Sequence, residues 1–300
     1  MSAVSIYIYI AVFCVFVFFI TYYITSYVRN YSLRNNVVDI PNERSSHFIP
    51  TPTGGGLAIS LSILLSIFIL SGLSSDAVSL SIALASGVFL IGVIGWFDIH
   101  KEVPVLIRAV LYLVSSVWAV WLLGGVNSLS IGGVNITSYW VSSFISVFWI
   151  AWLVNLYNFM DGTDGLAGVQ ALSTALFGAL FFVSSGHILA GIVCVTIVSS
   201  TSGFLVWNWA PAKIFMGDVG SCSLGFTFAV LAVYGQITSS VSLEVWLILL
   251  SIFIADASFT LIKRMLTGET WYRAHNTHAY QRMVQMGLSH GKLALYVLII

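Results

Sequence analysis

Charged residues are scarce in this chain. They make up 7% of the 300 residues, whereas hydrophobic residues make up 59%. A soluble globular domain carries about 25% Asp, Glu, Lys and Arg, because charge is needed to solvate its surface. The composition therefore excludes an ordinary soluble domain and indicates a protein whose surface lies largely in lipid.

Cysteines are few and net charge is absent. Cys14, Cys194 and Cys222 lie far apart in apolar runs, a spacing that indicates neither a disulfide framework nor a zinc site. The 11 basic residues are balanced by 11 acidic residues, so no overall positive charge favours a nucleic-acid partner. We expect membrane lipid and no nucleic acid as partners, and the sequence leaves an oligomer possible.

The first apolar run lacks the marks of a signal peptide. No basic segment precedes residues 5–24, and no small-residue cleavage site follows them. The run also approaches the roughly 20 residues that cross about 30 Å of hydrocarbon. We therefore interpret it as the first membrane helix.

Ten apolar runs are long enough to span or nearly span a bilayer. Inside lipid every backbone polar group must be satisfied within the protein, so we predict helices for all ten. The expected fold is all-α, a polytopic transmembrane helical bundle of about ten spans, with residues 1–300 forming one domain. We expect the last helix to continue beyond residue 300. The runs cover roughly residues 5–27, 54–72, 79–96, 106–123, 139–157, 166–184, 188–206, 222–237, 244–262 and 292 onward.

Basic residues mark one side of the membrane. With ten spans the loops alternate between two sides, and every Lys and Arg falls in or beside one set of loops. The positive-inside rule makes this side cytoplasmic and places the N-terminus outside. Most residues capable of chemistry lie on the same side, in the loops at residues 28–53, 97–105, 158–165, 207–221 and 263–291.

The densest polar cluster follows the fifth run. Asn155, Asn158 and Asp161 are spaced three apart, which places them on one face of a helix. Gly162 lets the chain turn, so that Asp164 comes back toward that face. Carboxylates and amides at a membrane edge are costly unless they meet a cation or a polar substrate. We therefore favour a functional site over a polar loop that only caps helix ends.

A second cluster precedes the eighth run. Gly217 and Gly220 allow backbone amides to approach an anionic ligand where the next helix begins. Asp218 between them is a hard oxygen ligand suited to Mg²⁺, and Lys213 supplies a positive charge suited to phosphate. Taken alone, this motif fits an ordinary helix cap equally well.

A histidine segment lies between the ninth and tenth runs. His275 and His278 are one helical turn apart, and Arg273 and Arg282 flank them. No carboxylate or cysteine stands at ligand spacing, which disfavours a zinc site. Cationic recognition of phosphate is the preferred hypothesis, and a solvated basic loop is the alternative.

Three further features are less specific. Asp98 ends the third run, where a solvated helix end is the ordinary interpretation. Asp256 lies inside the ninth run and serves equally well as a structural partner or as part of a site. Residues 50–56 contain prolines that exclude helix and three glycines that allow close packing at the membrane face.

Together these segments resemble the polyprenyl-phosphate N-acetylhexosamine-1-phosphate transferases of glycosyltransferase family 4. This family includes bacterial undecaprenyl-phosphate GlcNAc, QuiNAc and FucNAc-1-phosphate transferases and phospho-MurNAc-pentapeptide transferase. The matching segments, in the order of the family's motifs, are residues 50–56, 155–166, 215–221 and 275–278. Residues 44–47 and 274–280 are most similar to the branch that initiates O-antigen-like surface polysaccharides.

The resemblance implies a Mg²⁺-dependent enzyme of the bacterial inner (plasma) membrane with a cytoplasmic active site. It would transfer an N-acetylhexosamine 1-phosphate from a UDP-sugar to undecaprenyl phosphate and release UMP. By position, the metal would be held by Asn158 and Asp218. Catalytic roles would fall to Asp98, Asp161 and Asp164. Combined with the charge arguments above, the expected substrate contacts are Asn155, Lys213, Arg273, His275, His278 and Arg282.

The chain departs from the family pattern at Ile99, where members usually carry a second aspartate directly after the first, here Asp98. This difference motivates one alternative, an inactive homologue that serves as a scaffold. The other alternative is a transporter of lipid-linked substrates. A transporter would need polar residues deep in several helices and paired interrupted repeats, whereas here the polar groups end at one membrane face.

Overall fold

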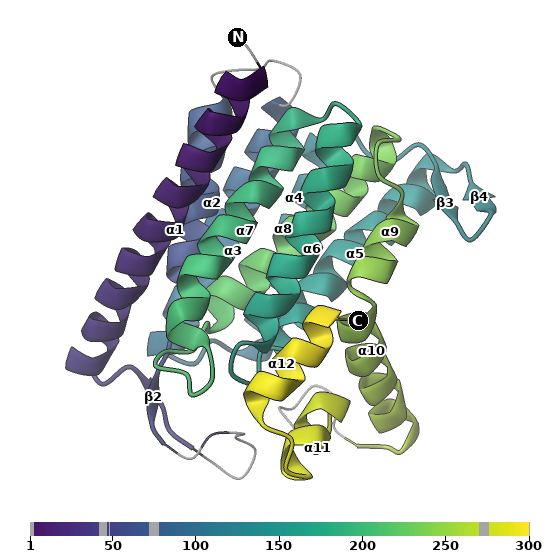
Figure 1. The fold of residues 1–300 in the computed structure, drawn as a ribbon. Coiled ribbons are helices and arrows are strands. Elements are labelled where there is room, and N and C mark those ends of the chain that lie inside the picture. Colours follow the sequence, from purple (N-terminus) through teal and green to yellow (C-terminus); the bar gives the residue numbers. More distant parts are fainter. Residues whose placement is uncertain (1–2, 42–46, 48, 72–77, 270–275, 300) are drawn as a thin grey trace.

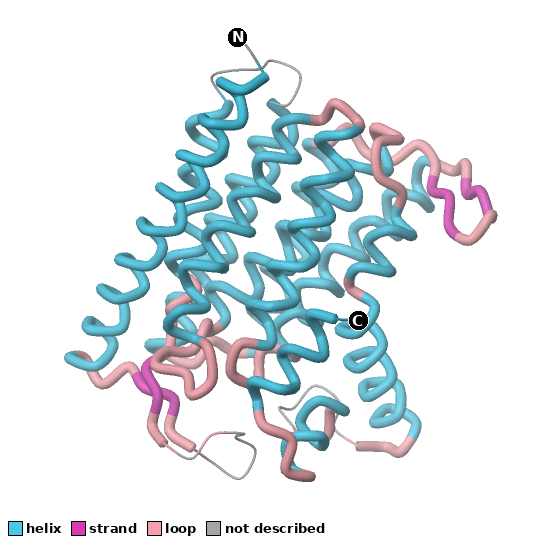
Figure 2. Tube along the Cα trace, viewed as in Figure 1, coloured by secondary structure: helices cyan, strands magenta, loops and turns pink. Residues whose placement is uncertain are grey.

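The structure, a computed structural model, describes residues 3–41, 47, 49–71, 78–269 and 276–299. It is almost wholly helical within these ranges (Figures 1 and 2). Two small antiparallel hairpins pair β1 (Val38–Asp39) with β2 (Thr51–Pro52) and β3 (Leu129–Ile131) with β4 (Val134–Ile136). The helices are α1 (Ala3–Arg34), α2 (Leu57–Ser71), α3 (Val78–His100), α4 (Val105–Leu122), α5 (Tyr139–Phe159), α6 (Leu166–Ser184), α7 (Ile188–Asn208), α8 (Asp218–Ile237), α9 (Leu243–Leu249), α10 (Ser251–Leu266), α11 (Ala279–Gln285) and α12 (His290–Ile299).

The predicted polytopic helical bundle is confirmed, and each of the ten apolar runs becomes a helix or a helix pair. Within the described residues, seven helices are long and apolar enough to cross a membrane, or up to eight if a bent pair counts as one span. The bent pair is α9 and α10, which meet at 80°. Runs two and ten form the shorter helices α2 and α12, so the span count by length is lower than the ten expected.

Two polar side chains of α6 explain how the break between α9 and α10 is tolerated. A break frees backbone carbonyls that find no water in an apolar environment. Gln170 Nε2 donates to the carbonyl of Leu249 at 2.7 Å, and Thr174 Oγ1 donates to it at 3.3 Å. Gln170 also donates to Thr174 at 2.8 Å. These contacts satisfy the exposed end of α9 and let α10 turn toward the end of the bundle that carries the charged loops.

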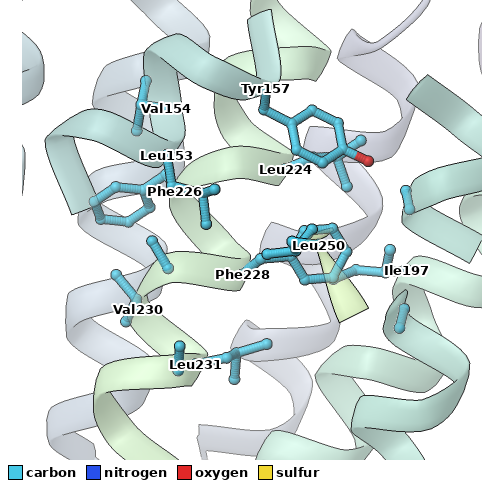
Figure 3. Packing of buried hydrophobic residues seen from close by; sticks show 14 of the residues in the cluster. Leu153, Val154, Tyr157, Ile197, Leu224, Phe226, Phe228, Val230, Leu231 and Leu250 are labelled. Carbon is cyan, nitrogen blue, oxygen red and sulfur yellow. The ribbon is translucent and has the colours of Figure 1, made fainter. Parts of the chain in front are cut away.

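Helix α8 lies at the centre of the bundle, between α3 and α5 (Figure 1). Figure 3 shows its buried side chains packed beside those of α5. Phe226 and Phe228 are fully buried, and the ring of Phe228 lies 6.0 Å from that of Tyr157 on α5. Gly87 of α3 leaves the room that the Phe226 ring occupies. Helices in lipid associate through close packing at small residues rather than by exclusion of water. The packing of α8 therefore fixes its first residue, Asp218, firmly against its neighbours.

The connecting segments that the structure describes fall at two opposite ends of the bundle. The loops that join α1 to α2, α5 to α6 and α7 to α8 lie at one end, together with α11, whereas the β3–β4 hairpin and the α6–α7 turn lie at the other (Figure 1). This is the alternation expected from the distribution of Lys and Arg. The segments with candidate chemistry consequently meet at a single end of the bundle.

Candidate active site

Three charged side chains form the centre of the site. Asp98 lies in the last turn of α3, Arg108 in the first turn of α4, and Asp218 begins α8. Arg108 Nη1 donates to Asp98 Oδ2 at 2.8 Å and to Asp218 Oδ2 at 2.6 Å. The three side chains are 18–25% exposed, so solvent screens these ion pairs only partly. The Arg108 guanidinium therefore joins α3, α4 and α8, and it holds together two aspartates that the sequence predicted to belong to the site.

The remaining carboxylate oxygens of this cluster are also engaged. The backbone N–H of Val103 donates to Asp98 Oδ1 at 2.7 Å, so Asp98 also organises the turn between α3 and α4. Asn158 Nδ2, near the end of α5, donates to Asp218 Oδ1 at 2.8 Å and to Ser221 Oγ at 3.2 Å. The structure thus brings together Asp98, Asn158 and Asp218, which lie in the predicted loops beside three separate apolar runs.

A backbone interlock fixes the start of α8. The N–H groups of Gly55 and Gly56 donate to the carbonyls of Phe215 and Met216, both at 2.9 Å. Gly56 and Gly220 touch backbone to backbone, and a Cβ on either one would overlap the other. The glycine-rich segment that looked weak in the sequence is therefore the support that holds Asp218 in position.

Ile99 fills the space beside this interlock. Its Cδ1 lies 3.2 Å from where a Cβ on Gly54 would stand, and 3.3 Å from the corresponding point at Gly217. The residue that replaces the family's second aspartate is therefore a packing residue, placed between the glycine-rich segment and the loop that leads into α8.

Asp161 approaches the same cluster from the turn between α5 and α6. Burial and the negative charge of Asp218 raise the pKa of Asp161 well above its ordinary value, although a hydrogen bond from the backbone N–H of Gly217 opposes the shift. A buried acid beside a like charge ionises readily only when positive charge is added nearby. A positive charge placed nearby would therefore lower the pKa of Asp161 and favour its ionised form.

Asp164, three residues further on, faces different groups. Its Oδ2 accepts from the backbone N–H of Ala212 at 3.0 Å, and its Oδ1 lies 3.3 Å from His290 Nδ1 on α12. Burial alone would raise the pKa of Asp164, but the bonds from His290 and Ala212 outweigh it and hold the pKa below its ordinary value. Asp161 therefore faces Asp218, whereas Asp164 faces His290 and Ala212.

Asp256 of α10 anchors the histidine segment. It accepts from the backbone N–H groups of Ala279 at 2.8 Å and Tyr280 at 3.0 Å, and lies 3.4 Å from His278 Nδ1. The Tyr280 hydroxyl in turn donates to the carbonyl of Phe159 at 3.0 Å. Of the two interpretations of Asp256, the structure supports a structural partner that carries His278, itself buried, to the end of α5 near the site.

Lys213 points toward α1 and α7. Its Nζ lies 5.7 Å from the centroid of the Trp207 ring, and the Arg29 guanidinium lies 5.8 Å from the same centroid. Arg29 Nε also donates to the Lys213 carbonyl at 3.3 Å. The structure therefore places Lys213 in a cation–π arrangement at the membrane edge, beside the central cluster rather than within it.

The structure describes two of the other predicted substrate residues, Asn155 and Arg282. Asn155 donates to the carbonyl of Ala151 within its own helix at 2.8 Å. Arg282 is exposed on α11. Arg273 and His275 lie outside the residues that the structure describes.

Sequence reasoning missed Arg108 and His290. Arg108 could have been found, because it begins a span ten residues after a carboxylate that ends the previous one, which brings the two charges to the same membrane face. His290 had no comparable signal. Its partner Asp164 is more than a hundred residues away, and only the packing of α12 brings the two together.

The oxygen donors fit a magnesium ion. Proteins commonly hold Mg²⁺ through one or two carboxylates, with waters and substrate phosphates completing the coordination. Asp218 and Asn158 offer a carboxylate and an amide, and ionised Asp161 would gain from a nearby cation. Among the described residues, no three His, Cys, Asp or Glu side chains form a ready-made metal site.

Comparison with known proteins points to the same region. The family model for glycosyl transferase family 4 matches residues 81–236. A probable undecaprenyl-phosphate N-acetylglucosaminyl 1-phosphate transferase of Bacillus subtilis is 30% identical over 284 residues, which cover 92% of this chain and 78% of the relative. A decaprenyl-phosphate N-acetylglucosaminephosphotransferase of Mycobacterium tuberculosis is 28% identical over 315 residues, with 93% and 76% covered. A phospho-N-acetylmuramoyl-pentapeptide-transferase of Streptococcus thermophilus is 41% identical over 110 residues, with 36% and 32% covered.

The family match includes Asp98, Arg108, Asn158, Asp161 and Asp218, the side chains that meet at the centre of the site. The similarity to the Bacillus subtilis protein extends along nearly the whole chain. The family expected from the four ordered motifs is thereby confirmed: the chain belongs to glycosyl transferase family 4.

Proposed function

We propose that this protein transfers an N-acetylhexosamine 1-phosphate from a UDP-sugar to undecaprenyl phosphate on the cytoplasmic face of a bacterial inner membrane. The product would be the lipid-linked precursor of a surface polysaccharide resembling O-antigen. The observation that carries the proposal is the cluster in which Arg108 bridges Asp98 and Asp218 and Asn158 donates to Asp218. The names of the relatives support the same class of reaction.

In this reaction an oxygen of the lipid phosphate attacks the phosphorus that carries the sugar. A new P–O–P bond forms, the bond from that phosphorus to the bridging oxygen breaks, and UMP leaves with that oxygen. Such transfers depend on charge neutralisation and in-line positioning more than on covalent chemistry by the protein. A bound Mg²⁺, held by Asp218 and Asn158, would supply positive charge to the pyrophosphate.

The chain's own side chains would orient the reactants. The basic residues of the histidine segment, which Asp256 anchors through His278 and α11, would contact the pyrophosphate, and Asp161 and Asp164 would order the loop beside it. Asp98 is the candidate base for the lipid phosphate, but both its oxygens already accept hydrogen bonds. A phosphate monoester with a second pKa of about 6 is mostly ionised at neutral pH, so the acceptor needs little help from a base.

The test is UMP release by the purified protein with Mg²⁺, undecaprenyl phosphate and a panel of UDP-GlcNAc, UDP-GalNAc and UDP-linked 6-deoxy N-acetylsugars. At least one donor should give UMP and a lipid-linked pyrophosphate sugar, and EDTA should stop the reaction. Asp218→Asn should abolish turnover in a folded protein. Absence of UMP with every donor would refute the proposal and favour the inactive homologue that Ile99 suggests.

A further inference from the structure

Helix α12 carries one polar residue on the face that it buries. His290, Leu293, Ala294 and Val297 are spaced i, i+3, i+4 and i+7, so they share one side of the helix. The three apolar residues are buried, and the His290 side chain is 17% exposed. The histidine therefore lies at the end of this buried face that meets the turn between α5 and α6.

His290 meets a carboxylate that is charged at neutral pH. Its Nδ1 lies 3.3 Å from Asp164 Oδ1 and 3.4 Å from the Asp164 backbone nitrogen. One ring nitrogen cannot donate to the carboxylate and accept from the N–H at the same time. Because the carboxylate is ionised, we assign the proton to Nδ1, and the His290 N–H then donates to Oδ1.

Asp164 is one of two points that fix the turn between α5 and α6 on the side away from Asp218. Its Oδ2 takes the Ala212 N–H at 3.0 Å, and the N–H of the next residue, Gly165, donates to Asn208 Oδ1 at 3.0 Å. Gly165 has a φ of 75°, a conformation that few residues other than glycine adopt. The turn is therefore held from α7 and α12, while Asp161 on its other side faces the cluster.

We infer that His290 is a positioning residue of this enzyme, which acts through Asp164 to hold Asp161 at the reacting phosphates. The inference rests on the proposed function. Without the His290 donor, Asp164 keeps only the Ala212 bond on a carboxylate that is 12% exposed. A buried carboxylate that loses a partner seeks another or takes up a proton, and either response loosens the turn that carries Asp161.

The experiment compares kcat and KM for purified His290→Ala, His290→Asn and His290→Gln proteins with a UDP-sugar that the natural chain uses. Displacement of a catalytic group by about 1 Å costs roughly a hundredfold in rate, so we expect His290→Ala to lower kcat tenfold to a hundredfold with little change in KM. The amide nitrogen of Asn can occupy the place of Nδ1, whereas that of Gln lies further out. Asn should therefore restore most of the lost kcat, and Gln should not.

Two control variants separate positioning from simple loosening of the helix. Leu293→Ala removes an apolar contact from the same face of α12 and should lower the melting temperature while keeping most of the kcat. His187→Ala removes a histidine that pairs with Tyr234 at the opposite end of the bundle and should leave kcat unchanged. A kcat for His290→Ala within twofold of the natural chain, or failure of Asn to restore it, would overturn the inference.

The contact can also be tested without turnover. In a melting-temperature cycle of His290→Ala, Asp164→Asn and the double variant, the double variant should lose less than the sum of the single losses, because both changes remove one interaction. Additive losses would overturn the inference even if no donor supports activity. An inactive natural chain would instead refute the proposed function, so the two failures are distinguishable.

Discussion

Replacement of Arg108 by methionine tests whether one guanidinium holds the acidic cluster together. Methionine keeps an unbranched apolar stem and removes the charge and the two bonds to Asp98 and Asp218, at 2.8 and 2.6 Å. In the variant two carboxylates face each other on neighbouring helices without a shared cation. Like charges at such a distance repel, and both groups remain partly desolvated.

The size of the effect follows from burial. Removing one partner of a fully buried ion pair costs about 3–5 kcal/mol, whereas exposed pairs contribute about 0–1 kcal/mol. The side chains of Arg108, Asp98 and Asp218 are 25%, 18% and 22% exposed, which places this cluster between the two limits. We expect a loss of about 2 kcal/mol, which corresponds to a fall in Tm of about 4 °C in a chain of this size.

The assay is thermal unfolding in detergent, with EDTA and with Mg²⁺. The fall in Tm should be largest in EDTA, and Mg²⁺ should raise the Tm of Arg108→Met more than that of the natural chain, because the ion supplies the missing positive charge. Lys101→Met removes the same charge from an exposed position in the adjoining loop and should leave Tm nearly unchanged. Equal Tm values for Arg108→Met and the natural chain under both conditions would refute the role given to Arg108.

Three further predictions use the same purified protein. Asp256→Asn keeps the side-chain shape but weakens the anchoring of α11, so turnover should fall at least tenfold, and unchanged kinetics would contradict the anchoring role. Gly56→Ala should lower the free energy of unfolding by about 1–3 kcal/mol through overpacking, as measured by Tm, whereas Gly92→Ala, whose Cβ would meet neighbours at 3.9–4.0 Å, should be tolerated. In EDTA, the free energy of unfolding should fall as pH rises from the ordinary pKa of an aspartate to the raised pKa of Asp161. The folded protein holds the Asp161 proton more tightly than the unfolded chain, so this contribution to stability is complete only below the unfolded pKa. Asp161→Asn should flatten the dependence of Tm on pH.

The sequence predicted the helices and the end of the bundle that carries the site because both depend on local pattern. An apolar run must become a helix in lipid, and a carboxylate next to a loop must lie at a membrane face. Asp98, Asn158 and Asp218 could therefore be assigned to one face before their contacts were known. The family motifs added the expectation that these three residues act together. In the structure they lie in one hydrogen-bonded cluster.

Features set by packing between distant segments could not be predicted. The 80° break within the ninth run depends on Gln170, whose amide reaches Leu249 from another helix, and no sequence pattern at the break announces it. His290 has the same difficulty, because its role depends on Asp164 and on how α12 docks. Lys213 is a further example. Its position in the sequence suggested a contact with phosphate, whereas in the structure its Nζ lies over the ring of Trp207.

The charge balance of the site bears on whether the proposed reaction needs an aspartate at position 99. Asp98, Asp161 and Asp218, once ionised, together with Arg108 leave a net charge of −2, which the single Mg²⁺ of the proposed reaction would balance. A second aspartate at position 99 would add charge that this arrangement does not compensate. It would also remove the apolar side chain of Ile99, which packs beside both Gly54 and Gly217.

Ile99→Asp should therefore lower the Tm in EDTA and leave turnover at saturating Mg²⁺ within about threefold of the natural chain, a difference of less than 1 kcal/mol. Ile99→Asn, of the same shape without the charge, separates lost packing from added repulsion, and only the aspartate variant should regain stability with Mg²⁺. A tenfold rise in turnover for Ile99→Asp would contradict this charge balance. It would show instead that the natural chain lacks a carboxylate that its chemistry needs.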